Sequence, residues 1–258
     1  MKENPLRIGA LVSGGGTNLQ AVLDACAGGR IPGRVVFVGS DNPEAHGLTR
    51  AKNAGIPTFV TDYGRILAER RRDPASHPAP PDWDQDQALA RQGIAKGSGA
   101  ARFLASRAAC EAALLEAMSP WPFDLLVLAG FMRLLSPYLM DRVSPDPFRP
   151  RIMNIHPAIL PAFPGTDGYG DTFRHGCKVG GCTVHFVDYG EDSGPIIGQR
   201  AFPILPADDL ESVKKKGLAL EWELYPECMR LFAEGRLAVE ANETGRRIVK
   251  ILPERGTP

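Results

Sequence analysis

Residues 7–26 read RIGALVSGGGTNLQAVLDAC: a short apolar run, a glycine-rich loop and a helical pattern. The apolar run predicts a buried strand, and the pattern after the loop predicts a helix that stops at Gly28-Gly29. Successive glycines let the backbone approach a ligand closely, and the start of a helix offers free N–H groups to an anion. The stretch therefore predicts the first unit of an α/β fold, with an anion site between strand and helix.

The glycine loop matches neither of the common nucleotide-binding patterns. No Gly-Lys-Ser/Thr follows it, as a P-loop requires. Counting from Gly14 and Gly16, Leu19 stands where a dinucleotide fingerprint has its third glycine. A phosphomonoester fits this loop better than a dinucleotide does. The alternative is a glycine turn that only connects the strand to the helix.

The alternation of strand and helix continues along the chain. Further strand patterns lie at 34–40, 56–60 and 123–130, with helical patterns at about 47–53 and 101–118. This order predicts an α/β fold with a doubly wound, mostly parallel sheet and helices on both faces. Strands through His156 and His185 and a long helix from Asp208 to about Glu234 complete it, and little pattern is visible after Val239.

We expect a single domain over residues 1–258, with a surface insertion at about 70–99. The insertion is rich in proline and polar residues, and residues 95–100 resemble a flexible linker. It is too short to hold a core of its own. We therefore expect it to be a passive surface segment.

Composition narrows the classes of protein. The chain has 258 residues, 43% of them hydrophobic, and a formal net charge of zero. Zero net charge argues against a broad nucleic-acid surface, which needs clustered lysine and arginine. No apolar run approaches the roughly 18 residues of a membrane span, and no signal-peptide core precedes the first strand. We expect a cytoplasmic protein that binds neither nucleic acid nor membrane.

The five cysteines are an odd and scattered set, which does not suggest a disulfide framework. One group, His175, Cys177, Cys182 and His185, has the residue types of a metal site. A strand through residues 182–187 would put Cys182 and His185 on opposite faces, and the group lacks Cys-x-x-Cys spacing. We therefore predict no metal site.

A second polar stretch, MNIHPAILP, occupies residues 153–161. Asn154 and His156 are two residues apart, so on a strand they share one face, and Pro157 cannot continue a central ladder. An amide and an imidazole therefore stand at a strand end, where open α/β sheets place their ligands. Asp192 lies in an acidic loop after a later strand and can pair with a histidine. The alternative is an ordinary strand-to-loop turn with a satisfied Asn and His.

The chain resembles the phosphoribosylglycinamide formyltransferases, folate-dependent enzymes of purine synthesis. The matching stretches follow the family's order over nearly the whole chain. They are LVSGGGTNLQ (11–20), VLAGFMRLLSP (127–137), MNIHP (153–157) with FPG (163–165), TVHFV (183–187) with DSGP (192–195), and EWELYP (221–226). The Asn-x-His-Pro pattern with a downstream Asp is shared by all folate-dependent formyltransferases, whereas the glycine loop is more specific.

The resemblance implies a site and a reaction. A formyl group passes from 10-formyltetrahydrofolate, the co-substrate, to the amine of glycinamide ribonucleotide. The implied catalytic set is Asn154, His156 and Asp192, with His185 beside it as a looser match. The implied substrate residues are Gly16, Thr17 and Asn18 for the phosphate and Glu221 for the ribose hydroxyls. The implied folate residues are Arg107, Met132, Arg133, Leu134, Leu135 and Val187.

The residue types suit that chemistry. Asn154 can stabilise the oxyanion of a tetrahedral intermediate, and protonated His156 can donate to the same oxygen. Asp192 favours the charged form of His156 and can accept the proton of the amine. No metal and no covalent nucleophile are needed. We expect small-molecule substrates and a monomer or weak homodimer.

One departure from the family and three rival functions remain open. Residues 165–172 lack the family's histidine-containing helix start, so Tyr169 and Asp171 become candidates to contact substrate. Formyltetrahydrofolate hydrolase normally has an extra domain before its first strand, which here starts near Arg7. Methionyl-tRNA formyltransferase needs a basic carboxy-terminal domain. A non-catalytic nucleotide-binding module would not need the Asn, His and Asp set.

Overall fold

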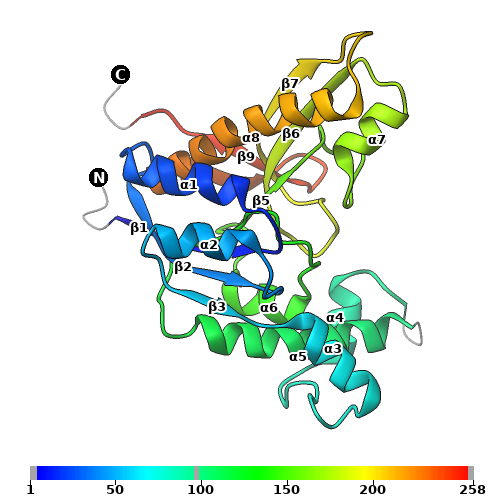
Figure 1. Ribbon diagram of the computed structural model, residues 1–258. Helices are drawn as coiled ribbons and strands as arrows, with labels where there is room; N and C mark the ends of the chain where they lie inside the picture. The colour runs from blue at the N-terminus through cyan, green and yellow to red at the C-terminus, as the bar shows by residue number, and fades with distance from the viewer. Residues whose placement is uncertain (1–4, 96–98, 255–258) are drawn as a thin grey trace.

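The computed structural model describes residues 5–95 and 99–254 and is built on a seven-stranded sheet in the order β3-β2-β1-β4-β5-β6-β7 (Figure 1). Its first five strands in sequence are parallel: β1 (Leu6–Val12), β2 (Gly33–Ser40), β3 (Thr58–Val60), β4 (Leu125–Leu128) and β5 (Ile152–His156). Two antiparallel strands extend one edge: β6 (Val179–Phe186) and β7 (Ile196–Pro203). The predicted doubly wound, mostly parallel sheet is confirmed.

Helices cover both faces of the sheet (Figure 1). One face packs against α1 (Thr17–Ala27), α2 (His46–Asn53) and α8 (Leu210–Ala233). The other packs against α3 (Tyr63–Arg72), α5 (Ala100–Met118) and α6 (Pro137–Val143). The sequence of β4 is apolar throughout because both faces of this strand are buried. Leu125 and Val127 pack into one core, and Leu126 and Leu128 pack into the other.

Strand order brings the polar stretches together. Strands β1, β4 and β5 are neighbours at the centre of the sheet, so the loops at their carboxyl ends meet at one edge. Strand β6 then pairs antiparallel with β5, which sets Asn154 opposite His185 in the ladder. The loop after β5 leads into α7 (Gly168–Arg174), which packs on α8.

The segment at about 70–99 corrects one expectation. It contains α4 (Gln85–Arg91), whose Ala88 and Leu89 are buried against Leu104 of α5. Asp82 accepts hydrogen bonds from Tyr138 and Arg142 of α6. The expectation of a passive surface segment is wrong, because the segment shares a small apolar core with α5. Residues 96–98, in the expected linker, lie outside the described part of the chain.

The stretch after Val239 is also more ordered than expected. It contains a hairpin of β8 (Leu237–Ala241) and β9 (Arg247–Ile251), joined by a turn in which Asn242 Oδ1 accepts from the N–H groups of Thr244 and Arg246. No helix among residues 5–95 and 99–254 is long and apolar enough to cross a membrane.

Candidate active site

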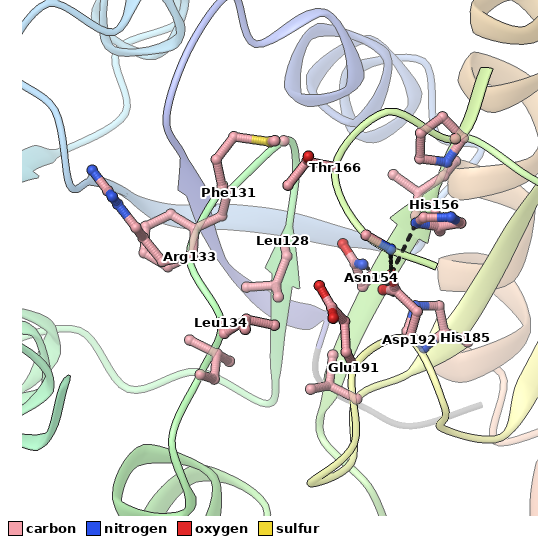
Figure 2. Close-up of a pocket in the computed structure, with 18 of the residues that line it drawn as sticks. Leu128, Phe131, Arg133, Leu134, Asn154, His156, Thr166, His185, Glu191 and Asp192 are labelled. Atoms are coloured by element: carbon pink, nitrogen blue, oxygen red, sulfur yellow. Dashed lines mark hydrogen bonds and ion pairs between the residues drawn. The ribbon is translucent and has the colours of Figure 1, made fainter. Parts of the chain in front are cut away.

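A cavity of about 680 Å³ lies where the central loops meet. In Figure 2, Arg133 and Leu134 lie on one side of it, and His156, His185 and Asp192 on the other. All but two of the residues named from the resemblance line this cavity. They are Asn18, Arg107, Met132, Arg133, Leu134, Leu135, Asn154, His156, His185, Val187, Asp192 and Glu221. Gly16 and Thr17 stand beside it, at the start of α1.

Asn154 is oriented by His185, its partner across the β5–β6 ladder. His185 Nδ1 lies 2.9 Å from the carbonyl oxygen of Phe186, which can only accept, so Nδ1 carries the proton of that hydrogen bond. His185 Nε2 lies 3.3 Å from Asn154 Nδ2. This contact occupies one hydrogen of the Asn154 amide, and the other remains for a ligand in the cavity.

His156 is held between a carbonyl oxygen and a carboxylate. Its Nε2 lies 2.8 Å from the Phe163 carbonyl oxygen, and its Nδ1 lies 3.2 Å from Asp192 Oδ2. The His156 residue is 2% exposed. Burial lowers the pKa of His156, against the raising influence of the Asp192 charge and the Phe163 carbonyl. Desolvation outweighs the carboxylate, so the neutral imidazole is favoured, and the expectation of a protonated His156 is corrected for the ligand-free protein.

A neutral His156 has a defined tautomer. The Phe163 carbonyl only accepts hydrogen bonds, so the single ring proton sits on Nε2. Nδ1 is then an acceptor that faces the Asp192 carboxylate. His156 Nδ1 and Asp192 Oδ2 are thus two neighbouring acceptors that can share a proton released by a substrate.

Asp192 keeps its charge in this setting. Burial alone would raise the pKa of Asp192, but the hydrogen bond from the Gly165 N–H and the proximity of His185 and His156 prevail and lower it. The Gly165 N–H donates to Oδ2 at 2.9 Å, and His185 Nε2 lies 3.6 Å from Oδ1. Asp192 has a φ of 49°, a left-handed conformation that Asp tolerates better than most residues.

The glycine loop leads into α1, whose N-terminus has no side-chain cap. Gly16 is the N-cap, with a φ of 68° and no side-chain capping hydrogen bond. A Cβ at this position would lie 2.6 Å from the Cα of Gly47, so both conformation and space require glycine. The N–H groups of the first turn are therefore left for an anion.

One network centred on Asp41 was not predicted from the sequence. The Ser13 hydroxyl donates to Asp41 Oδ1 at 2.5 Å and accepts from the Met132 N–H at 2.8 Å. Arg133 pairs with the other oxygen of Asp41, which is 2% exposed. Buried Asp41 thus joins the loops that follow β1, β2 and β4. The only available signal was Asp immediately after a buried strand.

The far end of the cavity is formed by the segment that had been expected to be passive. Gln92 and Ile94 line the cavity together with Phe103 and Arg107 of α5. Arg107 lies over the rings of Phe103 and Tyr63, at 5.1 and 5.8 Å from their centroids. Its buried Nε and Nη1 have no hydrogen-bond partner within the described residues, so this guanidinium can still bind an anionic group.

Glu221 of α8 lines the opposite end with both oxygens engaged. Asn18 Nδ2 donates to Oε2 at 2.6 Å, and the Tyr169 hydroxyl donates to Oε1 at 2.6 Å. Burial raises the pKa of Glu221, although these two hydrogen bonds act in the opposite direction. Leu218 and Lys214, about one and two turns earlier on α8, complete this end of the cavity.

The suspected metal group is dispersed. Cys182 packs into the core between the sheet and α8, while His185 faces the cavity. No group of three or more His, Cys, Asp or Glu side chains in the described ranges could hold a metal ion.

An amide, a histidine and a carboxylate at the edge of a doubly wound sheet have the residue types that acyl-group transfer needs. The family model described as formyl transferase matches residues 6–229, and the chain belongs to that family. The family uses a formyl-folate as co-substrate.

The relatives place the chain more narrowly. It is 34% identical to phosphoribosylglycinamide formyltransferase of Haemophilus influenzae, over 92% of this chain and 91% of the relative. It is 31% identical to the enzyme of the same name from Escherichia coli, over 92% of each chain. The crystal structure of glycinamide ribonucleotide transformylase 1 from Symbiobacterium toebii is similar, with a TM-score of 0.73 and 41% identity over 98% of this chain and 96% of the other.

Proposed function

We propose that this protein transfers the formyl group of 10-formyltetrahydrofolate to the amine of glycinamide ribonucleotide, a step of purine synthesis in the cytoplasm. The observation that carries the proposal is the convergence of Asn154, His156 and Asp192 in one cavity, between a carboxylate end and an arginine end. Relatives with this named activity align over nearly the whole chain.

The first chemical step is attack of the substrate amine on the formyl carbon. A C–N bond forms, and the electron pair of the carbonyl moves to its oxygen. The free hydrogen of the Asn154 amide stabilises this oxyanion, because the donor is fixed before charge develops. His185 supplies that fixation through its contact with Asn154 Nδ2.

The second step moves one proton. The amine becomes acidic once it has attacked, and Asp192 accepts its proton directly or through water. His156 Nδ1, 3.2 Å from Asp192 Oδ2, shares that proton as an acceptor. The same proton then passes to N10 of the folate as the C–N10 bond breaks. Tetrahydrofolate leaves, and no proton is gained or lost overall.

The remaining residues hold the two substrates. The first-turn N–H groups from Gly16 to Asn18 take the phosphate, and Glu221 takes the ribose hydroxyls. Met132 and Leu134 are 55% and 49% exposed and offer apolar surface to the pterin, with Leu135 and Val187 behind them. Arg107 and Arg133 face the carboxylates of the folate tail.

The test is a spectroscopic assay of tetrahydrofolate release from 10-formyltetrahydrofolate, with and without glycinamide ribonucleotide. Release that depends on the ribonucleotide supports transfer. Release at the same rate without it would identify a formyltetrahydrofolate hydrolase instead, and no release under either condition would exclude both activities.

A further inference from the structure

Tyr169, which the altered loop at 165–172 left as a candidate substrate contact, is not among the catalytic, ribonucleotide or folate residues implied by the resemblance. Its hydroxyl donates to Glu221 Oε1 at 2.6 Å, while Asn18 holds Oε2 at the same distance. Tyr169 and Glu221 are 5% and 4% exposed. Both oxygens of a buried carboxylate are therefore fixed by neutral donors from two different helices, α1 and α7.

The fold makes room for this tyrosine. Gly217 lies inside α8, and a Cβ there would stand 2.1 Å from Cζ of Tyr169 and 2.3 Å from its hydroxyl oxygen. Glycine weakens a helix interior, so its presence here is explained by the ring that fills the space. Phe202 and Val213 enclose the ring from β7 and α8. From this position the hydroxyl reaches Glu221 Oε1.

Counting acceptor positions shows what the arrangement leaves free. An ionised carboxylate has about four lone-pair positions. Asn18 and Tyr169 take one on each oxygen. About two positions remain, one on each oxygen, and Glu221 lines the cavity. A pair of adjacent hydroxyls, as on a ribose, has the two donors that match them.

We propose that Tyr169 is a positioning residue: its hydroxyl holds the Glu221 carboxylate in the one orientation that binds both ribose hydroxyls of the substrate. The inference rests on the proposed function, because that function supplies the ribose. A site built to bind a hydroxyl discriminates strongly against an analogue that lacks it, since a buried acceptor is then left unpaired. Tyr169 thereby sets the preference for ribose over 2-deoxyribose.

The decisive variant is Tyr169→Phe, which keeps the ring in its seat and removes only the hydroxyl. Steady-state kinetics are measured with glycinamide ribonucleotide and with its 2′-deoxy analogue. We expect KM for the ribonucleotide to rise about tenfold, the scale of a lost hydrogen bond to a charged group. The KM for 10-formyltetrahydrofolate and kcat stay within about twofold, and the preference for ribose over 2-deoxyribose shrinks.

Two further variants keep the test sharp. Tyr138 of α6 does not line the cavity, and its hydroxyl donates to Asp82; Tyr138→Phe removes that hydroxyl and should leave the substrate KM unchanged. Gly217→Ala introduces a Cβ into the seat of the Tyr169 ring and should reproduce the KM change of Tyr169→Phe.

The outcomes separate this inference from the proposed function. A wild-type protein without ribonucleotide-dependent release would overturn the proposed function itself. An active wild type with unchanged KM and unchanged ribose preference in Tyr169→Phe would overturn only the role of Tyr169. A loss of kcat with both substrates and a lower melting temperature would also count against it, as the mark of a purely structural residue.

Discussion

His156 Nδ1 lies 3.2 Å from Asp192 Oδ2, and burial and charge act on the imidazole in opposite directions. The effect of burial is the larger one and lowers the pKa of His156. The pair therefore consists of a neutral imidazole and a carboxylate, which are both proton acceptors, and not of two opposite charges. This relationship makes Asp192 the group whose loss is most informative, since it is the charged member of the pair.

Asp192→Asn should lower turnover by roughly 10²-fold or more, the scale of a lost acid–base group. The fold should persist, because Asn tolerates the left-handed φ of 49° at this position. Turnover is measured by tetrahydrofolate release and folding by circular dichroism. Near-normal turnover in this variant would remove Asp192 from the proton transfer.

Glu111 gives a prediction about stability and pH. It is fully buried on α5, accepts from the Ser136 N–H, and burial raises its pKa to about 8 from an ordinary value of 4.5. Between those pH values the folded protein keeps a proton that the unfolded chain releases, so rising pH favours unfolding. Glu111→Gln has no such proton, so its stability relative to wild type should rise with pH across this window and level off above about 8.

Urea unfolding at pH 6, 7, 8 and 9 measures this difference, whose slope cannot exceed about 1.4 kcal/mol per pH unit. Glutamine can replace both contacts, because its oxygen accepts from the Ser136 N–H and its amide donates to the Ser136 hydroxyl. A difference independent of pH would mean that Glu111 does not hold its proton in the folded protein.

Arg91→Ala should weaken folate binding selectively. Arg91 of α4 pairs with Asp141 at 3.2 Å and lies 5.0 Å from the ring centroid of Tyr189, in the loop that forms one cavity wall. The KM for 10-formyltetrahydrofolate should rise about two- to fivefold, the scale of a partly exposed ion pair, with the ribonucleotide KM unchanged. Arg65→Ala, which removes a surface pair with Glu69 on α3, is the matched control.

The phosphate of the ribonucleotide should be held by backbone N–H groups at the start of α1. The loop has no basic side chain, and the first turn lacks a side-chain cap. A crystal grown with phosphate should show the ion within hydrogen-bond reach of Gly16, Thr17 or Asn18. A substrate phosphate bound elsewhere in the cavity would refute this assignment.

The central sheet was predictable because each strand carries its own signal. The apolar run of β4 indicates a strand buried on both faces, and the spacing of Asn154 and His156 indicates one shared face. From these local patterns, and from the rule that ligands bind at the carboxyl ends of strands, Asn154, His156 and Asp192 could be predicted to lie at one edge of the sheet. The resemblance supplied Glu221 and Arg107, which no local pattern distinguishes from other charged helix residues.

The remaining features depend on tertiary contacts. The half-buried hairpin of β8 and β9 has only weak alternation, so its strands were missed. The segment at about 70–99 was expected to be passive because it has few apolar residues. Its contact with α5 is a tertiary contact that no local pattern in the segment indicates. The neutral state of His156 follows from its desolvation, which a sequence does not contain. The role of Asp41 depends on its contacts with Ser13 and Arg133, which are distant in the sequence.

The hydroxyl of Ser13 has a consequence for how the two substrates meet. Its one hydrogen is directed at Asp41, so its lone pairs are what receive the Met132 N–H. The loop after β1 and the loop after β4 are thereby joined through one hydroxyl group. Because the proposed function assigns the ribonucleotide phosphate to the first loop and the pterin to the second, we expect this link through Ser13 to contribute to the distance between the substrate amine and the formyl carbon.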